Sequence, residues 1–230
     1  MKKYLLPLLL LLSLNAQAQE SLEPQPLDDL MSPDEIAEES GFPRTEIPLV
    51  VKSVDDIART ESLDVFREFR VVLIINKKAA GVGAQRMRVY LNGFLTYDWL
   101  VSTGRERWET AKSGRTYFSV TPTGYFYPYM LNKDHYSETW KTPMPYAVFF
   151  NGGIAVHATT PGLYKQLGSR ASGGCVRLQH ENAAFVFNRI QTEGRGLVPV
   201  INRNGTISRD RRGNVIRRVN YRTLIIVEDR

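Results

Sequence analysis

From Arg70 onward the chain has the two-residue hydrophobic period of β-strands, and this period limits the possible folds more than any other feature. Residues 70–76, RVVLIIN, are mostly apolar and β-branched, which is typical of a buried strand. Residues 85–101 alternate on both sides of Asn92-Gly93, a dipeptide that favours the tight turn of a β-hairpin. We therefore expect a mainly β protein.

Short apolar runs bounded by Gly, Pro or Asn predict further strands along the chain. One main helix is predicted over 180–194, where three apolar residues share a face and Gly194 follows as a stop. His135 lies in a stretch that we expect to be a loop. Many short strands with little helix indicate a β-sandwich or a barrel-like β-fold. The further strands are expected at 124–130, 146–150, 153–158, 196–202 and 214–230.

The N-terminus has the pattern of a cleavable secretory signal peptide. Lys2 and Lys3 precede an apolar run that is short for a membrane span, and the small residues Ala16 and Ala18 follow it. No cysteine lies at this cleavage site, which argues against a lipid anchor of the bacterial lipoprotein kind. We expect removal of residues 1–18, a periplasmic location and no transmembrane span after cleavage.

Charge separates an acidic leader from a basic body. Residues 20–48 carry nine acidic side chains and one basic, whereas residues 49–230 carry 27 basic and 15 acidic ones. The basic body suits an anionic partner such as cell-wall polymer, or it serves solubility alone. We expect four parts: a signal peptide (1–18), an acidic Pro-containing leader with short helices (19–68), a main domain (69–202) and a basic C-terminal β extension (203–230).

The leader contains the start and stop of a short helix. Ser32, Pro33 and Glu35 fit the N-cap, N1 and N3 positions, and Gly41 follows as a stop. A second helix is expected over 53–69. The N-terminal extension is therefore predicted to be partly helical, either packed on the domain or hanging from it.

The chain has a single cysteine, Cys175, so an internal disulfide is impossible. Such a thiol is either buried and inert or kept for its reactivity. Nucleophilic thiol chemistry needs a base, donors for an oxyanion and access for the acyl group. Of the three histidines, His157 is the best candidate base, because it lies where a predicted strand gives way to a loop.

Two glycines precede the cysteine. Gly173 and Gly174 would let backbone N–H groups approach an oxyanion, or they form an ordinary tight turn. The helix predicted from residue 180 would favour the thiolate of Cys175 if its N-terminus points that way. In that case Cys175 should react with iodoacetamide faster than an unperturbed thiol at neutral pH.

The run HATTPGLYKQLGSRASGGCVRL resembles the catalytic signature of the YkuD-type L,D-transpeptidases. Matching residues are Ser172, Gly174, Cys175, Val176 and Arg177. Upstream, VSTGR, TPTGYF and MPYAVFFNGGIAVH are similar to the family's strand and turn landmarks, in the expected order. The resemblance extends over residues 71–202 and implies a YkuD-type β-fold with one main helix after the cysteine.

The resemblance also implies an exported cysteine acyltransferase that acts on peptidoglycan stem tetrapeptides. Cys175 would attack the L-to-D peptide bond, release the terminal D-alanine and hold the rest as a thioester. His157 would act as base and then as acid. The backbone carbonyl of Ala158 would support the histidine, although many relatives have glycine at that position.

Further roles follow from the same resemblance. Backbone N–H groups at Gly173, Gly174 and Cys175 would form the oxyanion hole, and many relatives carry histidine or another side chain in place of Gly173. Substrate binding is expected at Arg177, Ser172 and Tyr146. Arg177 would pair with a substrate carboxylate or else form a structural ion pair. Tyr146 belongs to an aromatic-rich stretch that would form a lid over substrate or simply fill the strands.

One thioester serves several acyl acceptors. A stem amine gives a 3-3 cross-link, water gives L,D-carboxypeptidase or endopeptidase activity, and a protein amine anchors a cell-wall protein. The stem amine is the family's commonest acceptor. Peptidoglycan stem peptides are the expected partners, with a cell-wall-anchored protein as an alternative acceptor; nucleic acid is not expected, because an exported protein seldom meets it.

Two other classes of protein are alternatives. A metal-dependent hydrolase would use His157 and Cys175 as ligands, but the sequence lacks a paired zinc motif, so we expect no metal and no cofactor. A non-catalytic cell-wall binding module would keep the fold without the chemistry. The joint presence of Cys175, His157 and Arg177 argues against that module.

Overall fold

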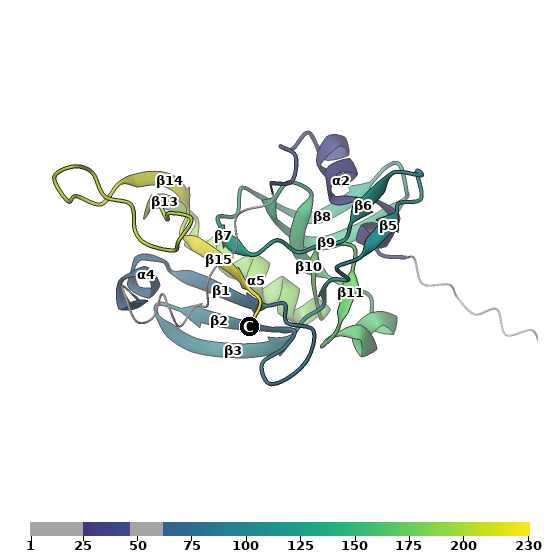
Figure 1. The fold of residues 1–230 in the computed structure, drawn as a ribbon, viewed down its shortest axis with the longest axis horizontal. Helices are drawn as coiled ribbons and strands as arrows, with labels where there is room; N and C mark the ends of the chain where they lie inside the picture. Colours follow the sequence, from purple (N-terminus) through teal and green to yellow (C-terminus); the bar gives the residue numbers. More distant parts are fainter. Residues whose placement is uncertain (1–24, 47–61) are drawn as a thin grey trace, which may run out of the picture.

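The computed structural model describes residues 25–46 and 62–230 (Figure 1). The predicted signal peptide over 1–18 lies outside the described residues, as does the first half of the helix predicted over 53–69. The end of that helix is present as α4 (Ser62–Glu68). Within the two described ranges, no helix is long and apolar enough to cross a membrane.

The larger sheet has five strands in the order β3-β2-β1-β15-β7. Its centre is a parallel pair, β1 and β15, and every residue of both strands is buried, because apolar clusters cover the sheet on both faces. Asn92 and Gly93 form the predicted hairpin turn with φ of 50° and 85°. The strands are β1 (Val71–Asn76), β2 (Arg86–Leu91), β3 (Phe94–Leu100), β7 (Gly124–Phe126) and β15 (Thr223–Glu228).

The second sheet has four strands in the order β12-β10-β9-β8. The main apolar core lies between the two sheets and includes one face of α5, which follows the cysteine as predicted. The mainly β fold class predicted from the sequence is confirmed. The elements are β8 (Met130–Ser137), β9 (Thr142–Asn151), β10 (Ile154–Ala158), β12 (Val176–Leu178) and α5 (His180–Glu193).

The prediction of a loop around His135 is wrong. This residue lies in β8, opposite Met144 of β9, and its ring packs edge-on against Phe149. Asn132 and Asp134 disguise the strand in the sequence, because their polar side chains lie on its solvent-facing positions.

Shorter elements connect the two sheets. The β5–β6 hairpin and the β13–β14 hairpin lie at opposite ends of the molecule in Figure 1. The β4 strand pairs in parallel with β11, just before the cysteine loop. These elements are β4 (Thr103–Gly104), β5 (Trp108–Thr110), β6 (Thr116–Phe118), η1 (Pro161–Gln166), β11 (Arg170–Ser172), β13 (Arg195–Pro199) and β14 (Arg217–Tyr221).

Residues 25–46, called the N-terminal segment from here on, pack against the second sheet. The segment contains α1 (Leu27–Leu30) and α2 (Pro33–Ser40). The α2 helix begins with the predicted Ser32–Glu35 capping box and ends at Gly41 with φ 68°. Apolar side chains of the segment join a third cluster with residues of β9, Ala155 of β10 and Cys175.

Candidate active site

Two neighbouring strands position the thiol, the histidine and the arginine. The β10 and β12 strands run parallel, with His157 opposite Arg177. Because side chains alternate along a strand, these two residues share a face with Cys175, which directly precedes β12. The residues between them, Val156 and Val176, face the main core instead. The sheet therefore gathers three of the predicted site residues on its outer face.

His157 is held in one orientation. Its Nδ1 lies 2.8 Å from the carbonyl oxygen of Ala158, so Nδ1 carries the hydrogen and Nε2 is left as an acceptor. Nε2 is buried and has no hydrogen-bond partner among the described residues. This tautomer leaves the Nε2 lone pair available to take a proton.

The loop before Cys175 is fixed by internal hydrogen bonds. The Ser172 hydroxyl donates to the Cys175 carbonyl at 2.6 Å and accepts from the Gly174 N–H at 3.2 Å. Gly174 has φ 147°, a backbone conformation that favours glycine. Thr121, from the TPTG stretch, donates to the Gly174 carbonyl at 2.7 Å. Ser172 is thus turned into the loop, where it orients the backbone around the thiol.

A carboxylate from the N-terminal segment lies at the centre of the site. Asp28 of α1 accepts hydrogen bonds from Arg177 at 3.0–3.2 Å and from the Gly173 N–H at 3.4 Å. One of its oxygens lies 3.7 Å from His157 Nε2. The side chains of Asp28, His157, Arg177 and Cys175 are all between 0 and 2% exposed.

The electrostatics of this closed site oppose thiolate formation. Burial raises the pKa of the Cys175 thiol well above its ordinary value, and the nearby Asp28 carboxylate raises it further. Burial lowers the pKa of His157, and Asp28 only partly offsets this. The condition for rapid alkylation, a lowered thiol pKa, is therefore not met in this arrangement, because the thiol is covered and lies beside a carboxylate rather than facing solvent.

The same three groups form a candidate ligand set for a metal ion. Atoms of Asp28, His157 and Cys175 lie within 4.8 Å of one another, and these residue types suit Zn²⁺. The carboxylate is already engaged by the Arg177 guanidinium, whose positive charge opposes a dication at this position. The set therefore fits an ion pair better than a metal.

Tyr146 packs against α5. Its ring packs edge-on against His180 and Phe187 of α5, with centroid separations of 5.1 and 5.8 Å. His180 in turn lines a cavity of about 150 Å³ next to His157. Tyr146 therefore lies behind this cavity wall, where it supports α5.

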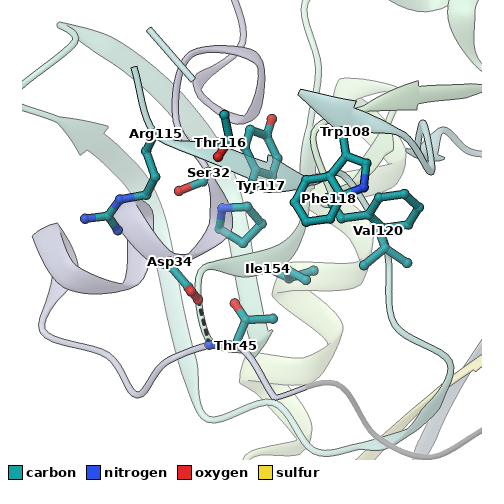
Figure 2. Close-up of a pocket in the computed structure, with 11 residues that line it drawn as sticks. Ser32, Asp34, Thr45, Trp108, Arg115, Thr116, Tyr117, Phe118, Val120 and Ile154 are labelled. Carbon is teal, nitrogen blue, oxygen red and sulfur yellow. Dashed lines mark hydrogen bonds between the residues drawn. The ribbon is translucent and has the colours of Figure 1, made fainter. Parts of the chain in front are cut away.

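A second cavity lies on the other side of the N-terminal segment. It has a volume of about 310 Å³ and a mainly apolar surface, although polar side chains also line it. Figure 2 shows Trp108 and Phe118 of the β5–β6 hairpin across from Asp34, with Val120 and Ile154 near the floor. Val120 and Ile154 also lie next to Gly174, so this cavity reaches toward the cysteine loop.

Asp28 is the site residue that sequence reasoning missed. Asp28 belongs to the acidic leader, and no local pattern separates it from the eight other acidic residues between positions 20 and 48. The opposite charges of leader and body were a general indication that the two could associate. They did not identify which carboxylate would reach the thiol.

A thiol and an oriented histidine held by adjacent strands of a mainly β domain have the groups that nucleophilic acyl-transfer chemistry requires. Residues 70–207 match the YkuD family, described as the L,D-transpeptidase catalytic domain. The chain belongs to this family.

Several solved structures that are similar to the chain are named L,D-transpeptidases. An L,D-transpeptidase from Xylanimonas cellulosilytica is 20% identical over 84% of this chain and 68% of that one, with a TM-score of 0.45. One from Mycobacterium smegmatis is 17% identical over 70% of this chain and 59% of that one, with a TM-score of 0.44. The transpeptidase LdtMt1 in complex with imipenem is 17% identical, with a TM-score of 0.44, and the chain spans 59% of its length. No curated protein matches the chain.

Proposed function

We propose that this protein is an exported L,D-transpeptidase that forms 3-3 cross-links between peptidoglycan stems through a thioester on Cys175. The observation that carries the proposal is the proximity of Cys175 to His157, within 4.8 Å, with His157 Nδ1 held by the Ala158 carbonyl. Family membership supports an acyltransferase, and the predicted signal peptide supports a periplasmic location.

In the first half-reaction, the Cys175 thiol passes its proton to His157 Nε2, and the thiolate attacks the carbonyl carbon of the L-to-D peptide bond. The Gly173 N–H, which donates to the Asp28 carboxylate in this structure, would donate to the resulting oxyanion instead, whereas the Gly174 N–H is held within the loop by Ser172. The carbon–nitrogen bond then breaks, His157 protonates the departing amine, and D-alanine leaves behind a Cys175 thioester.

In the second half-reaction, an acceptor amine attacks the thioester carbonyl carbon. His157 takes a proton from the amine, the carbon–sulfur bond breaks, and the proton returns to the Cys175 sulfur. The product is a new amide bond, and the enzyme is restored. Arg177 would hold a carboxylate of the stem peptide, because its guanidinium already binds carboxylates in this structure.

Mass spectrometry of disaccharide-tetrapeptide monomers incubated with the protein tests this proposal. We expect 3-3 dimers and free D-alanine, both absent with Cys175→Ala. Accumulation of tripeptide without dimers would assign water as the acceptor. If the protein and its variants bind the disaccharide-tetrapeptide but none of them forms a covalent product, this would contradict the transpeptidase and favour a binding module.

A further inference from the structure

The N-terminal segment passes directly over the catalytic thiol. Leu27, Met31 and Ile36 form one apolar cluster with Cys175, which has no exposed surface. A stem peptide must bring a carbonyl carbon within about 3.5 Å of the sulfur to react. No substrate of that size can reach Cys175 while the segment stays in place.

The segment also separates the cavities around the site. Ser32 and Pro33 line the cavity beside Gly174, whereas Gln25 and Pro26 line the cavity beside His157. Cys175 directly follows Gly174 in the chain and lies within 4.8 Å of His157, so each cavity adjoins one neighbour of the thiol. A substrate groove past Cys175 would therefore run through the space that the segment fills.

Ion pairs, a backbone hydrogen bond and apolar contacts hold the segment at several points. Asp29 forms ion pairs with Arg105 at 2.7 Å and with Arg177 at 2.7 Å. The Lys112 N–H donates to the Leu30 carbonyl at 2.9 Å, and the Phe42 ring packs on Phe149. The segment joins neither sheet, so separation from the body would break no strand pairing.

Two glycines of the body leave room for the segment backbone. A Cβ at Gly173 would collide with the Asp28 carbonyl, and a Cβ at Gly153 would collide with the Pro33 carbonyl and approach Ile36 Cβ at 2.7 Å. Neither glycine has a positive φ, so the local conformation does not demand glycine at either position. Their missing side chains are explained by the close approach of the segment.

We propose that residues 25–46 are a self-inhibitory segment that covers Cys175, with Asp28 in the place of a substrate carboxylate on Arg177. The assignment of the carboxylate as a substrate mimic rests on the proposed function. The covering of the thiol does not, because it follows from contacts within the chain.

Alkylation of Cys175 by iodoacetamide, followed by intact mass, tests the cover without any assay of catalysis. The chain has one cysteine, so the added mass reports on this residue alone. We expect the folded chain to react at least about 100-fold more slowly than the chain in denaturant, since labelling waits for the segment to open.

Two variants should weaken the contact between the segment and the body, one by a change in the segment and one by a change in the body. Ile36→Glu places a charge in the buried face of α2, and Gly153→Ala places a methyl group against Pro33 without altering the segment. Each should accelerate labelling by about tenfold or more. Pro43→Ser is the matched control, because Pro43 lies in the same segment but is exposed; its labelling rate should not change.

The outcomes separate the two proposals. Wild-type labelling as fast as in denaturant would overturn the self-inhibitory segment, and so would unchanged labelling in Gly153→Ala with a native circular dichroism spectrum. The second variant decides the matter even if Ile36→Glu fails to fold. Rapid labelling of opened variants that still make no product from tetrapeptide would leave the cover standing and refute the transpeptidase.

Discussion

The two ends of the described chain are attached to the body in different ways. The last strand, β15, pairs with β1 along six residues and is buried throughout. The N-terminal segment buries apolar side chains too, but it adds no strand to either sheet. A strand in the middle of a sheet is part of the fold, because its loss leaves backbone groups unpaired on both neighbours. A segment held mainly by side-chain contacts, without strand pairing, behaves more like a bound ligand.

The expected C-terminal extension over 203–230 has two structurally different parts. Its first part forms an exposed turn and the β14 strand of a hairpin that projects from the body (Figure 1). Its last part, β15, lies between β1 and β7 at the heart of the larger sheet. The terminal residues are therefore as central to the fold as the strand that begins the domain.

The largest expected effect is on β15. Ile225→Asp would bury an unpaired carboxylate between the sheets, at a cost of roughly 4 kcal/mol or more, comparable to the stability of many domains. We expect loss of the cooperative thermal transition in circular dichroism. Val219→Asp, on the exposed face of β14, should keep it. A cooperative transition in Ile225→Asp would contradict the central role of this strand.

A smaller effect on the fold, but a large one on the site, is expected for Arg177→Met. It leaves Asp28 buried without its ion-pair partner, which costs about 3–5 kcal/mol and should expel the segment rather than unfold the body. Labelling of Cys175 should rise by about 100-fold or more. The double variant with Asp28→Leu should restore slow labelling, because apolar groups can replace a buried ion pair. Fast labelling in both the single and the double variant would contradict the idea that the Asp28–Arg177 ion pair keeps the segment docked.

Acid should loosen the segment before it affects β15. Burial alone would raise the pKa of Asp28, but Arg177 and His157 outweigh it and hold the pKa below its ordinary value. Docking thus gains stability from Asp28 above the ordinary pKa, and loses it as the pH falls below about 4 toward the lowered pKa. Hydrogen exchange, corrected for intrinsic rates, should rise first in 33–41; simultaneous exposure of β15 would indicate global unfolding.

The smallest effect is expected at the rim. Arg115 pairs with Glu38 of α2 at 3.1 Å on the surface, where solvent and salt screen the interaction. Arg115→Ala should leave the labelling rate of Cys175 unchanged at low and high salt. A clear acceleration would mean that surface charge, rather than the buried contacts, keeps the segment in place.

The sequence predicted those parts of the fold that depend on neighbouring residues. Asn92-Gly93, the Ser32–Glu35 capping box and the helix after the cysteine all follow from local backbone preferences. The resemblance to the YkuD family predicted that Cys175 and His157 lie in one site. Each of these patterns lies within a short stretch of chain or within a known signature.

The parts that were missed depend on packing between distant residues. His135 lies in a strand because β8 pairs with β9. Asp28 reaches the thiol because Gly153 and Gly173 leave room for the segment. An absent side chain has no pattern of its own, so Gly173 could be read only as part of a turn or an oxyanion hole. Its contact with Asp28 supplies the steric reason that the sequence lacked.

Because Asp28 is covalently part of the chain, inhibition by the segment should not depend on the protein concentration. A separate inhibitor would dissociate when the protein is diluted, but the local concentration of a tethered carboxylate does not depend on how many copies of the protein are present. Dilution therefore cannot switch such an enzyme on. The active fraction of the enzyme would instead depend on the local concentration of peptide carboxylates that compete with Asp28 for Arg177. The composition of the cell wall would then control the activity.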